Sequence, residues 1–350
     1  MSQTSELDTL ARDIVRQHSH LALQADPLQR LLMDMTAVPT VLADPTGQAV
    51  YAACRALDFI DADAQCVARA WQQQTERTGQ FDASAWPTEP QDFGLRTLPV
   101  IASEASPASS LRAKRGNPGL PDFMDCHGAG APRNDESSDA GADRFAPCPH
   151  QLGLYAVLPD AAWVGRMARA GVPTVQLRFK SNDPAAIKRE VEAAVQAVHG
   201  TGALLFINDH WQAAIAAGAY GVHLGQEDLE GLGGADLNAI RVAGLRLGVS
   251  SHGYAEMLRA AAVNPSYIAM GAVYATTLKR MATPPQGPAR LKVYAALLRD
   301  TPTVAIGGID AARLPEVLAS GVGSVAVVRA LVAAEQPEAQ AAALQALFRR

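Results

Sequence analysis

Residues 204–228 read LLFINDHWQAAIAAGAYGVHLGQED, and this stretch decides the fold. An apolar run ends at Asn208 and Asp209, an alanine-rich stretch with helical spacing follows, and a second apolar run at 221–224 leads into another polar cluster. Runs that are apolar throughout indicate strands buried on both faces, as in a parallel sheet. Polar side chains directly after such strands indicate a site at the carboxyl edge of that sheet.

The same unit repeats from residue 152 onward, so that short β-branched runs alternate with helical stretches. Eight such units favour an α/β fold of the closed (β/α)8 type, a TIM barrel, over a doubly wound open sheet. A dinucleotide-binding sheet would need a glycine-rich turn after its first strand, whereas this strand runs into Pro159-Asp160-Ala161-Ala162. The expected strands are 154–158, 174–177, 204–207, 221–224, 245–249, 267–270, 303–306 and 324–328, with a last helix at about 330–348.

Composition sets the class of the protein. The chain has 350 residues, 48% of them hydrophobic, and a net charge of −5, which gives no reason to expect nucleic acid or an anionic membrane as a partner. No apolar run reaches the roughly 18 residues that a membrane helix needs. The polar N-terminus lacks a signal-peptide core, so we expect a cytoplasmic protein. All 4 cysteines precede residue 150, in a spacing that fits no trusted disulfide or zinc pattern.

The first 149 residues differ from the rest. Residues 1–102 form a region of unknown function, in which 52–78 has helical spacing and 38–43 and 98–102 have the composition of short strands. Residues 103–149 are rich in serine, glycine and proline and cannot bury enough apolar surface to offset the entropy of ordering them. We therefore expect a disordered linker or insertion at 103–149 and a barrel domain at 150–350.

Two basic residues follow the second expected strand. Arg178 and Lys180 alternate, so both side chains can point the same way and clamp a pyrophosphate. Gln176, two residues earlier on the same face, offers an amide to a heterocycle. The alternative is a surface strand end whose basic groups are merely solvated.

Two carboxylates follow the next strands. Asp209 and Asp228 come after the third and fourth strands, which are neighbours in a barrel, and beside two basic residues they indicate Mg²⁺ that bridges to substrate phosphates. Asn208 can donate to a phosphate or a heterocycle. The alternative for either aspartate is that it caps the helix that follows its strand.

The later strand ends offer further groups for phosphate. Ser250 ends the fifth strand, and Lys279 lies in the loop after the sixth, where either can contact a phosphate or a leaving group. Gly307-Gly308 follows the seventh strand, and Val328-Arg329 opens the last helix, an arrangement typical of the phosphate cradle of barrels.

Three aromatic side chains near these ends are ambiguous. His223 and His252 can act as general bases, but we expect both to be structural histidines with satisfied hydrogen bonds. Tyr274 either stacks on a heterocycle or packs within its loop.

These clusters resemble one family, thiamine-phosphate synthase. The resemblance covers roughly residues 150–350, in order and without large gaps, and leaves residues 1–149 unexplained. The matching stretches are LGLYAVLPD (152–160), QLRFK (176–180), LFINDHW (205–211), YGVHLGQEDL (220–229), LRLGVSSH (245–252), PSYIAMG (265–271), PPQG (284–287), PTVAIGGI (302–309) and GVGSVAVV (321–328).

The resemblance implies that the chain joins hydroxymethylpyrimidine pyrophosphate to a thiazole phosphate, or its carboxylate, to give thiamine monophosphate and pyrophosphate. It implies small-molecule substrates, with neither nucleic acid nor membrane as a partner, and leaves a homo-oligomer open. It also implies roles for individual residues. The residues expected to bind the pyrophosphate are Arg178, Lys180, Asn208 and Lys279, and those expected to hold Mg²⁺ are Asp209 and Asp228. Gln176 and Ser250 are expected near the pyrimidine and the leaving group. Thr276 is expected at the thiazole, and Gly307, Gly308, Val328 and Arg329 are expected at its phosphate.

The sequence departs from the family pattern in places. Leu278 stands where the family shows a second threonine, Arg329 where it shows serine, and Phe179 where it shows a polar or aliphatic residue. Two other readings therefore stay open. One is a catalytically silent barrel that binds thiazole phosphates or a partner protein. The other is a different phosphate-binding barrel enzyme, which would want an acid–base pair or a Schiff-base lysine inside the barrel.

Overall fold

The computed structural model describes residues 3–31, 44–95, 144–276 and 283–349. Its centre is a closed barrel in which each parallel strand pairs with the next and the last pairs with the first. The predicted (β/α)8 barrel is therefore confirmed, and four strands have the expected bounds. The strands are β1 Gly153–Leu158, β2 Thr174–Leu177, β3 Leu204–Asn208, β4 Gly221–Leu224, β5 Arg246–Ser251, β6 Tyr267–Met270, β7 Thr303–Ile306 and β8 Ser324–Val327.

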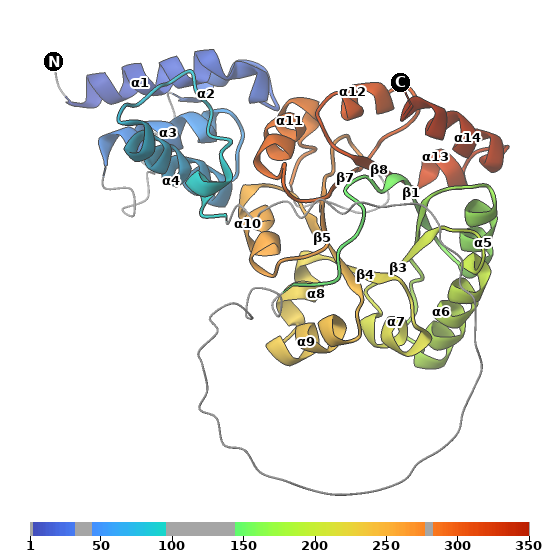
Figure 1. Ribbon diagram of the computed structural model, residues 1–350. Coiled ribbons are helices and arrows are strands. Elements are labelled where there is room, and N and C mark those ends of the chain that lie inside the picture. Colours follow the sequence, from blue (N-terminus) through green and yellow to red (C-terminus); the bar gives the residue numbers. More distant parts are fainter. Residues whose placement is uncertain (1–2, 32–43, 96–143, 277–282, 350) are drawn as a thin grey trace, which may run out of the picture. The chain divides into compact units, whose positions relative to one another are not determined.

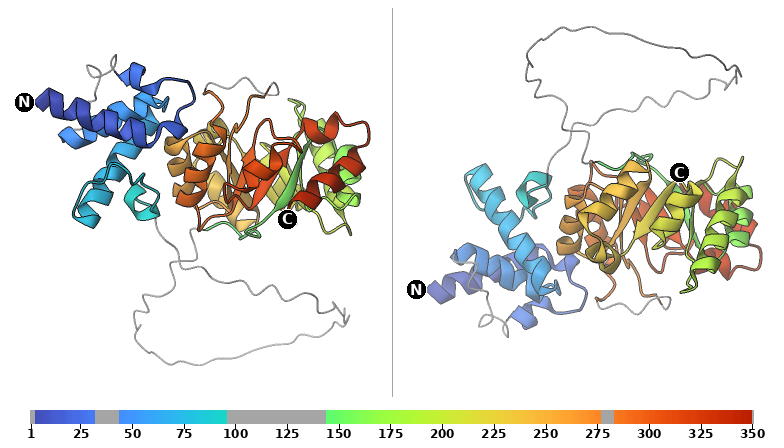
Figure 2. Two further views of the ribbon diagram at one scale, coloured as in Figure 1. Left: turned by 90° about the horizontal axis from the view of Figure 1, so that it is seen from above. Right: turned by 90° about the horizontal axis from the view of Figure 1, so that it is seen from below.

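Helices surround the strands (Figures 1 and 2). The single last helix expected at 330–348 is wrong, because two helices occupy this stretch. Pro337 begins the second one, where its missing N–H costs nothing, and it could not have continued the first. The barrel helices are α5 Ala161–Arg169, α6 Pro184–Val198, α7 Trp211–Ala217, α8 Gln226–Gly231, α9 Gly234–Val242, α10 Tyr254–Ala262, α11 Gly287–Leu297, α12 Leu314–Leu318, α13 Arg329–Val332 and α14 Pro337–Leu347.

An aromatic cluster fills part of the barrel interior. Tyr155, Phe206 and Tyr267 are at most 1% exposed and pack on one another. Two glycines make room for these rings. A methyl group at Gly248 would lie 2.1 Å from the Tyr267 ring, and one at Gly221 would lie 2.5 Å from the Phe206 ring. The interior is thus a packed core rather than a pore.

The region before the barrel is helical. The helical spacing over 52–78 corresponds to two helices, because the chain breaks after residue 56 and starts again at Asp61, with Asp58 between them in the left-handed region (φ 69°). The expected strands at 38–43 and 98–102 lie outside the described residues. We use the term N-terminal helices for α1 Gln3–Gln17, η1 Ser19–Leu21, α2 Pro27–Leu31, α3 Pro45–Ala56, α4 Asp61–Thr78 and η2 Pro90–Phe93.

The last residues of the expected linker pack on the barrel. Phe145 is 5% exposed beneath the Arg241 guanidinium, whose carbon lies 4.7 Å from the ring centre. The Ala146 carbonyl accepts a hydrogen bond from the Ser266 hydroxyl at 2.7 Å. Residues 144–149 of the expected linker are therefore held on the barrel, because an aromatic anchor offsets the entropy of ordering them. Residues 103–143 of the expected linker lie outside the described residues.

Residues 1–97 and 144–350 form one compact unit. Helix α4 packs on α10, where the Asp63 carboxylate accepts a hydrogen bond from the Ala255 N–H at 2.9 Å. A carboxylate at this place satisfies a free N–H of the first helical turn and complements the helix dipole. In the described part of the chain, no helix has the length and apolar character required to cross a bilayer.

The buried Asp63 predicts a specific pH dependence of stability. Burial raises the pKa of Asp63 to about 6, although the Ala255 N–H and the charge of Arg290 oppose this shift. The folded state therefore holds the proton more tightly than the unfolded state, whose aspartate pKa is about 3.9. The stability contributed by this proton is present below pH ~4 and is lost as the pH rises through about 6.

Asp63→Asn removes this titration. We expect the free energy of unfolding of the wild type, minus that of the variant, to fall by about 2 kcal/mol between pH 4 and pH 7. Urea unfolding of both proteins at several pH values measures this difference. A difference that stays constant with pH would contradict the assignment.

Candidate active site

The carboxyl end of β2 presents a guanidinium that has no hydrogen-bond partner among the described residues. The Arg178 N–H donates to the Leu158 carbonyl at 2.7 Å, so the chain stays beside β1 for one residue beyond the strand. The Arg178 side chain is half-buried, and no group in the described ranges accepts a hydrogen bond from its guanidinium. An arginine held in this way is free to take both oxygens of an anionic ligand.

Lys180 and Asp209 form an ion pair at the same edge of the barrel. The Lys180 Nζ lies 2.7 Å from the Asp209 Oδ2. Asp209 follows β3 in the left-handed region (φ 63°), a conformation that aspartate tolerates better than most residues. Its N–H donates to the His223 carbonyl at 3.0 Å, which ties this turn to β4.

Asp228 completes this acidic pair. It lies in the first turn of α8, where its Oδ2 accepts a hydrogen bond from the Gly225 N–H at 3.1 Å. The helix-capping alternative is thus realised, yet the carboxyl group also faces Asp209. Partial burial, followed by the negative charge of Asp209, raises the pKa of Asp228.

Two facing carboxylates beside a lysine suit a hard divalent cation. Mg²⁺ typically takes one or two protein carboxylates and completes its shell with water and substrate phosphates. A cation between Asp209 and Asp228 would relieve their repulsion. No group of three or more histidine, cysteine, aspartate or glutamate residues able to hold a metal occurs among the residues that the structure covers.

A continuous chain of hydrogen bonds runs through the barrel interior and ends at two of the expected substrate residues. Each link is between 2.7 and 2.9 Å long. The chain crosses β3, β2, β1, β6, β4 and β5, and its members in order are Asn208, Gln176, Tyr155, Tyr267, His223 and Ser250.

The hydrogens in this chain all point one way. Tyr155 donates its only hydroxyl proton to the Gln176 Oε1, so Tyr267 must donate to Tyr155. The Tyr267 oxygen then accepts from the His223 Nδ1–H, which leaves the neutral Nε2 to accept from Ser250. At the other end, the Gln176 amide donates to the Asn208 Oδ1. The chain therefore presents a hydroxyl oxygen of Ser250 as an acceptor and the amide N–H groups of Asn208 as donors.

The environment of His223 keeps it neutral. Burial lowers the pKa of His223 to about 4, and the charge of Asp209 opposes this shift only in part. Both ring nitrogens have hydrogen-bond partners, as predicted for a structural histidine. His252 is also satisfied, because its Nδ1 pairs with the Glu256 carboxylate at 2.6 Å.

The glycine pair after β7 receives the loop that follows β6. Gly307 (φ 108°) and Gly308 (φ 64°) both adopt the left-handed region. A methyl group at Gly307 would lie 2.5 Å from the Ala272 side chain, and one at Gly308 would lie 2.6 Å from the Ala275 carbonyl. The close approach of this loop explains why both positions are glycine, and the sequence alone does not reveal this reason.

Tyr274 packs within this loop region and is held by its neighbours. The Arg313 guanidinium lies over its ring at 4.6 Å, and its hydroxyl donates to Glu316 at 2.7 Å. Thr276 is half-buried in the same loop. Leu278 and Lys279 lie outside the described residues.

Val328 and Arg329 follow β8. Val328 is half-buried and precedes α13, whose first residue, Arg329, is exposed. No described hydrogen bond joins either side chain to the interior chain. Whether they hold a phosphate with the glycine pair stays a prediction.

Sequence reasoning missed three residues of the site. Tyr155 and Tyr267 carry the centre of the hydrogen-bond chain, and Gln226 donates to the Ser250 carbonyl at 2.7 Å. A signal existed for the tyrosines, because a hydroxyl in an otherwise apolar strand needs a partner when it is buried. Their contact was beyond reach, since 112 residues separate them.

Comparisons with known proteins show which family this chain resembles. Residues 154–331 match the family model described as thiamine monophosphate synthase. The thiamine-phosphate synthase of Neisseria gonorrhoeae is 54% identical over 204 residues, which are 58% of this chain and 98% of that protein. The enzyme of the same name from Cronobacter sakazakii is 53% identical over 190 residues, 54% of this chain and 89% of that protein. A solved thiamine phosphate pyrophosphorylase from Pyrococcus furiosus is 26% identical and has a TM-score of 0.49, covering 57% of this chain and 96% of its own.

Tyr267→Phe tests the interior hydrogen-bond chain. Loss of the hydroxyl leaves the His223 Nδ1–H without an acceptor, so we expect the neutral ring to move its proton to Nε2 and the protein to lose about 1–3 kcal/mol of stability. Nitrogen chemical shifts of His223 and urea unfolding measure the two effects. Tyr274→Phe, which removes an exposed hydroxyl, serves as the control.

In the wild type, His223 should stay neutral with its proton on Nδ1 from pH 5 to pH 8, because its pKa is about 4. Titration of this histidine near pH 6.5, or an unchanged tautomer in Tyr267→Phe, would show that the interior hydrogen bonds are not connected as described.

Proposed function

This chain belongs to the thiamine monophosphate synthase family, and on that premise we propose how its barrel carries out the family's reaction. The reaction joins hydroxymethylpyrimidine pyrophosphate to a thiazole phosphate and releases thiamine monophosphate and pyrophosphate. The observation that carries the proposal is the intact set of charged groups after β2, β3 and β4. These are Arg178, which has no partner among the described residues, the Lys180–Asp209 ion pair and the facing Asp228.

Arg178 and Lys180 bind the pyrophosphate. The guanidinium offers two parallel donors to phosphate oxygens, while the ammonium acts as a mobile point charge. Lys180 already pairs with Asp209, so a pyrophosphate that arrives with a cation can exchange partners without leaving a charge unpaired. Lys279 is proposed to help at this site on the strength of the family resemblance alone.

Asp209 and Asp228 are proposed to hold Mg²⁺. The cation would neutralise charge on the leaving pyrophosphate and orient it. The two carboxylates come from the ends of β3 and β4, which are next to the end of β2 that carries Arg178, so all three groups would act on one pyrophosphate. The position of Lys180 beside Asp209 fits this arrangement, since it balances one negative charge before the substrate binds.

The ends of the interior chain are proposed to recognise the aminopyrimidine. Such a ring has an amino group that donates and ring nitrogens that accept. The Ser250 hydroxyl oxygen can accept from the amino group, and the Asn208 amide can donate to a ring nitrogen or a phosphate. The interior chain fixes this polarity, because reversing Ser250 would require every link behind it to reverse.

The bond that breaks joins the exocyclic CH₂ carbon to a pyrophosphate oxygen, which leaves with the electron pair. The electron-rich aminopyrimidine stabilises the resulting positive carbon, and the thiazole nitrogen donates its lone pair to form the new C–N bond. No strong general base is needed for these steps. The neutral His223 is consistent with this, because it positions Ser250 and does not have to take up a proton.

The thiazole phosphate is proposed to bind near Thr276, with its phosphate toward Gly307, Gly308, Val328 and Arg329. The loop after β6 lies against the glycine pair, so these groups share one side of the barrel mouth. The pyrophosphate groups lie after β2 to β4. The two substrates would then enter from opposite sides with their reactive atoms between them.

Arg178→Ala tests the clamp. We expect kcat/KM for the pyrimidine pyrophosphate to fall about 100-fold or more, because donors to a developing negative charge contribute mainly in the transition state. Arg189→Ala removes an exposed arginine of α6 and should change kcat/KM less than about twofold. Steady-state formation of thiamine monophosphate measures both. Full activity of the Arg178 variant would remove the clamp from the mechanism.

Asp228→Asn tests the metal site. With one carboxylate fewer, we expect the Mg²⁺ concentration for half-maximal activity to rise about tenfold or more. Glu227→Gln changes the adjacent exposed carboxylate and should leave this concentration unchanged. Activity measured against added Mg²⁺ after treatment with a chelator compares the two variants. An equal Mg²⁺ requirement in both would place the metal elsewhere.

A further inference from the structure

Arg290 in α11 is a buried cation that the proposed reaction does not use. Its side chain is 1% exposed and binds the N-terminal helices. The Nε donates to the Leu21 carbonyl at 3.0 Å, and the Nη2 donates to the Leu57 carbonyl at 2.6 Å. The guanidinium also lies 3.8 Å from the centre of the Phe59 ring. A buried guanidinium has to be paired, so the N-terminal helices complete the environment of this barrel residue.

The remaining arm of Arg290 reaches the loop between β6 and α11. Its Nη1 donates to the Gln286 Oε1 at 3.1 Å, and the Tyr294 hydroxyl donates to the same oxygen at 3.0 Å. The Gln286 Nε2 in turn donates to the Pro284 carbonyl at 2.8 Å. The Gln286 side chain is therefore fixed between the helix and the end of the loop.

The backbone at Gln286 joins the two ends of this loop. The Gln286 N–H donates to the Ala272 carbonyl at 2.8 Å, and the Gly287 N–H donates to the Val273 carbonyl at 2.9 Å. The first half of the loop then meets β7, where the Tyr274 N–H donates to the Gly307 carbonyl at 3.0 Å. Thr276 lies two residues further along. An unbroken series of contacts thus connects the N-terminal helices to the loop that carries Thr276.

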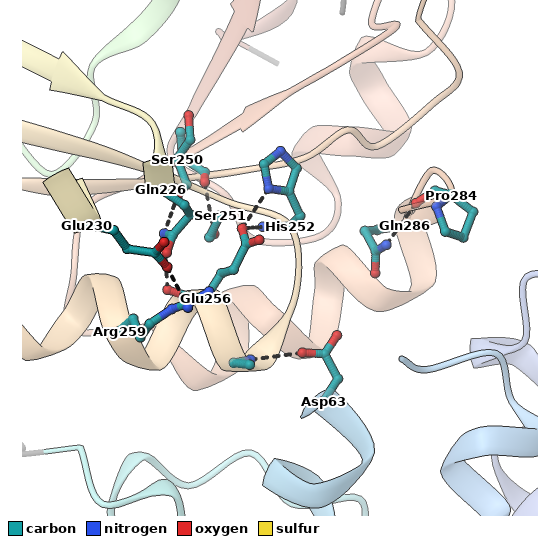
Figure 3. Close-up of polar contacts among 12 residues, drawn as sticks. Asp63, Gln226, Glu230, Ser250, Ser251, His252, Glu256, Arg259, Pro284 and Gln286 are labelled. Carbon is teal, nitrogen blue, oxygen red and sulfur yellow. Dashed lines mark hydrogen bonds and ion pairs between the residues drawn. The ribbon is translucent and has the colours of Figure 1, made fainter. Parts of the chain in front are cut away.

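A second contact connects the N-terminal helices to the barrel at α10. Asp63 points at the first turn of this helix, as Figure 3 shows. A methyl group at Gly253 would lie 2.1 Å from the Asp63 Oδ2, so glycine is what admits this carboxylate. The Trp86 Nε1 also donates to the Tyr254 hydroxyl at 2.9 Å. Gly253 is three residues after Ser250, so this contact supports the end of β5.

We propose that the N-terminal helices brace the active site, and that Arg290 and Gln286 are positioning residues for the loop between β6 and α11. Docking of these helices keeps Arg290 paired, Arg290 holds Gln286, and Gln286 holds the ends of the loop. The consequence for catalysis rests on the proposed function, since it assigns Thr276 to the thiazole phosphate. The bracing of the loop itself depends only on the contacts of Arg290, Gln286 and Asp63.

Two changes in the full-length chain disturb the brace from different sides. Arg290→Met keeps much of the side-chain volume and removes every hydrogen bond to Leu21, Leu57 and Gln286. Gly253→Ala leaves Arg290 intact and pushes Asp63 away, and Asp63→Ala in the same chain restores the space. Gly234→Ala in α9, where an added methyl meets nothing within 4 Å, is the matched control.

Hydrogen exchange reads the brace without reference to activity. In both variants we expect the amides of Gln286 and Gly287 to exchange about tenfold faster or more, while those of 174–177 in β2 stay protected. The Asp63→Ala change should return the Gly253→Ala protein only part of the way toward wild type, because it relieves the clash but also removes the hydrogen bond to the Ala255 N–H. Unchanged exchange at Gln286 and Gly287 in a folded Gly253→Ala protein would overturn the brace, and this variant decides the matter if Arg290→Met fails to fold.

Steady-state kinetics test whether Arg290 and Gln286 position the loop for catalysis. We expect kcat/KM for the thiazole phosphate to fall about tenfold in both variants. In Arg290→Met, which leaves the contact of Asp63 with α10 in place, binding of the pyrimidine pyrophosphate should change less than about threefold. Wild-type kinetics together with faster exchange would restrict the helices to stability and overturn the positioning role. If the wild-type chain forms no thiamine monophosphate, the proposed function fails, and the exchange experiment alone decides the brace.

Discussion

The barrel interior imposes the constraint on which the site depends: buried hydroxyl, amide and imidazole groups must all be paired. Tyr155 and Tyr267 bring two hydroxyls into a buried core, and a one-directional chain of donors satisfies both. That direction sets the tautomer of His223 and leaves the Ser250 hydroxyl oxygen free to accept a hydrogen bond. Packing inside the barrel therefore determines which hydrogen-bonding groups face the mouth.

At the mouth of the barrel, the charged side chains and the neutral hydrogen-bonding groups occupy separate places. Arg178, Lys180 and the two aspartates gather after β2, β3 and β4, whereas the interior chain ends in neutral groups at Asn208 and Ser250. A substrate with a pyrophosphate at one end and a polar heterocycle at the other matches this division. In the proposed reaction, the charged groups would act on the part of the substrate that departs, and the neutral groups would hold the part that stays.

Sequence reasoning recovers what depends on local pattern. The apolar runs predicted the barrel, and the polar residues after them predicted Arg178, Lys180, Asp209 and Asp228 at one edge, because consecutive parallel strands are neighbours. Contacts between distant residues were not predictable. The link from Tyr155 to Tyr267 depends on how rings pack in the closed barrel, and the burial of Arg290 depends on carbonyl groups more than 200 residues away. The break before Pro337 has a local signal, the proline itself, but the helical periodicity on both sides of it led to the prediction of one continuous helix.

Phosphorus NMR of the full-length chain with hydroxymethylpyrimidine pyrophosphate, thiazole phosphate and Mg²⁺ tests the central claim most directly. The account predicts that pyrophosphate and thiamine monophosphate appear in equal amounts, and that both cease to form when Mg²⁺ is chelated. Binding of both substrates without either product would contradict it, and would identify the barrel as a catalytically silent relative.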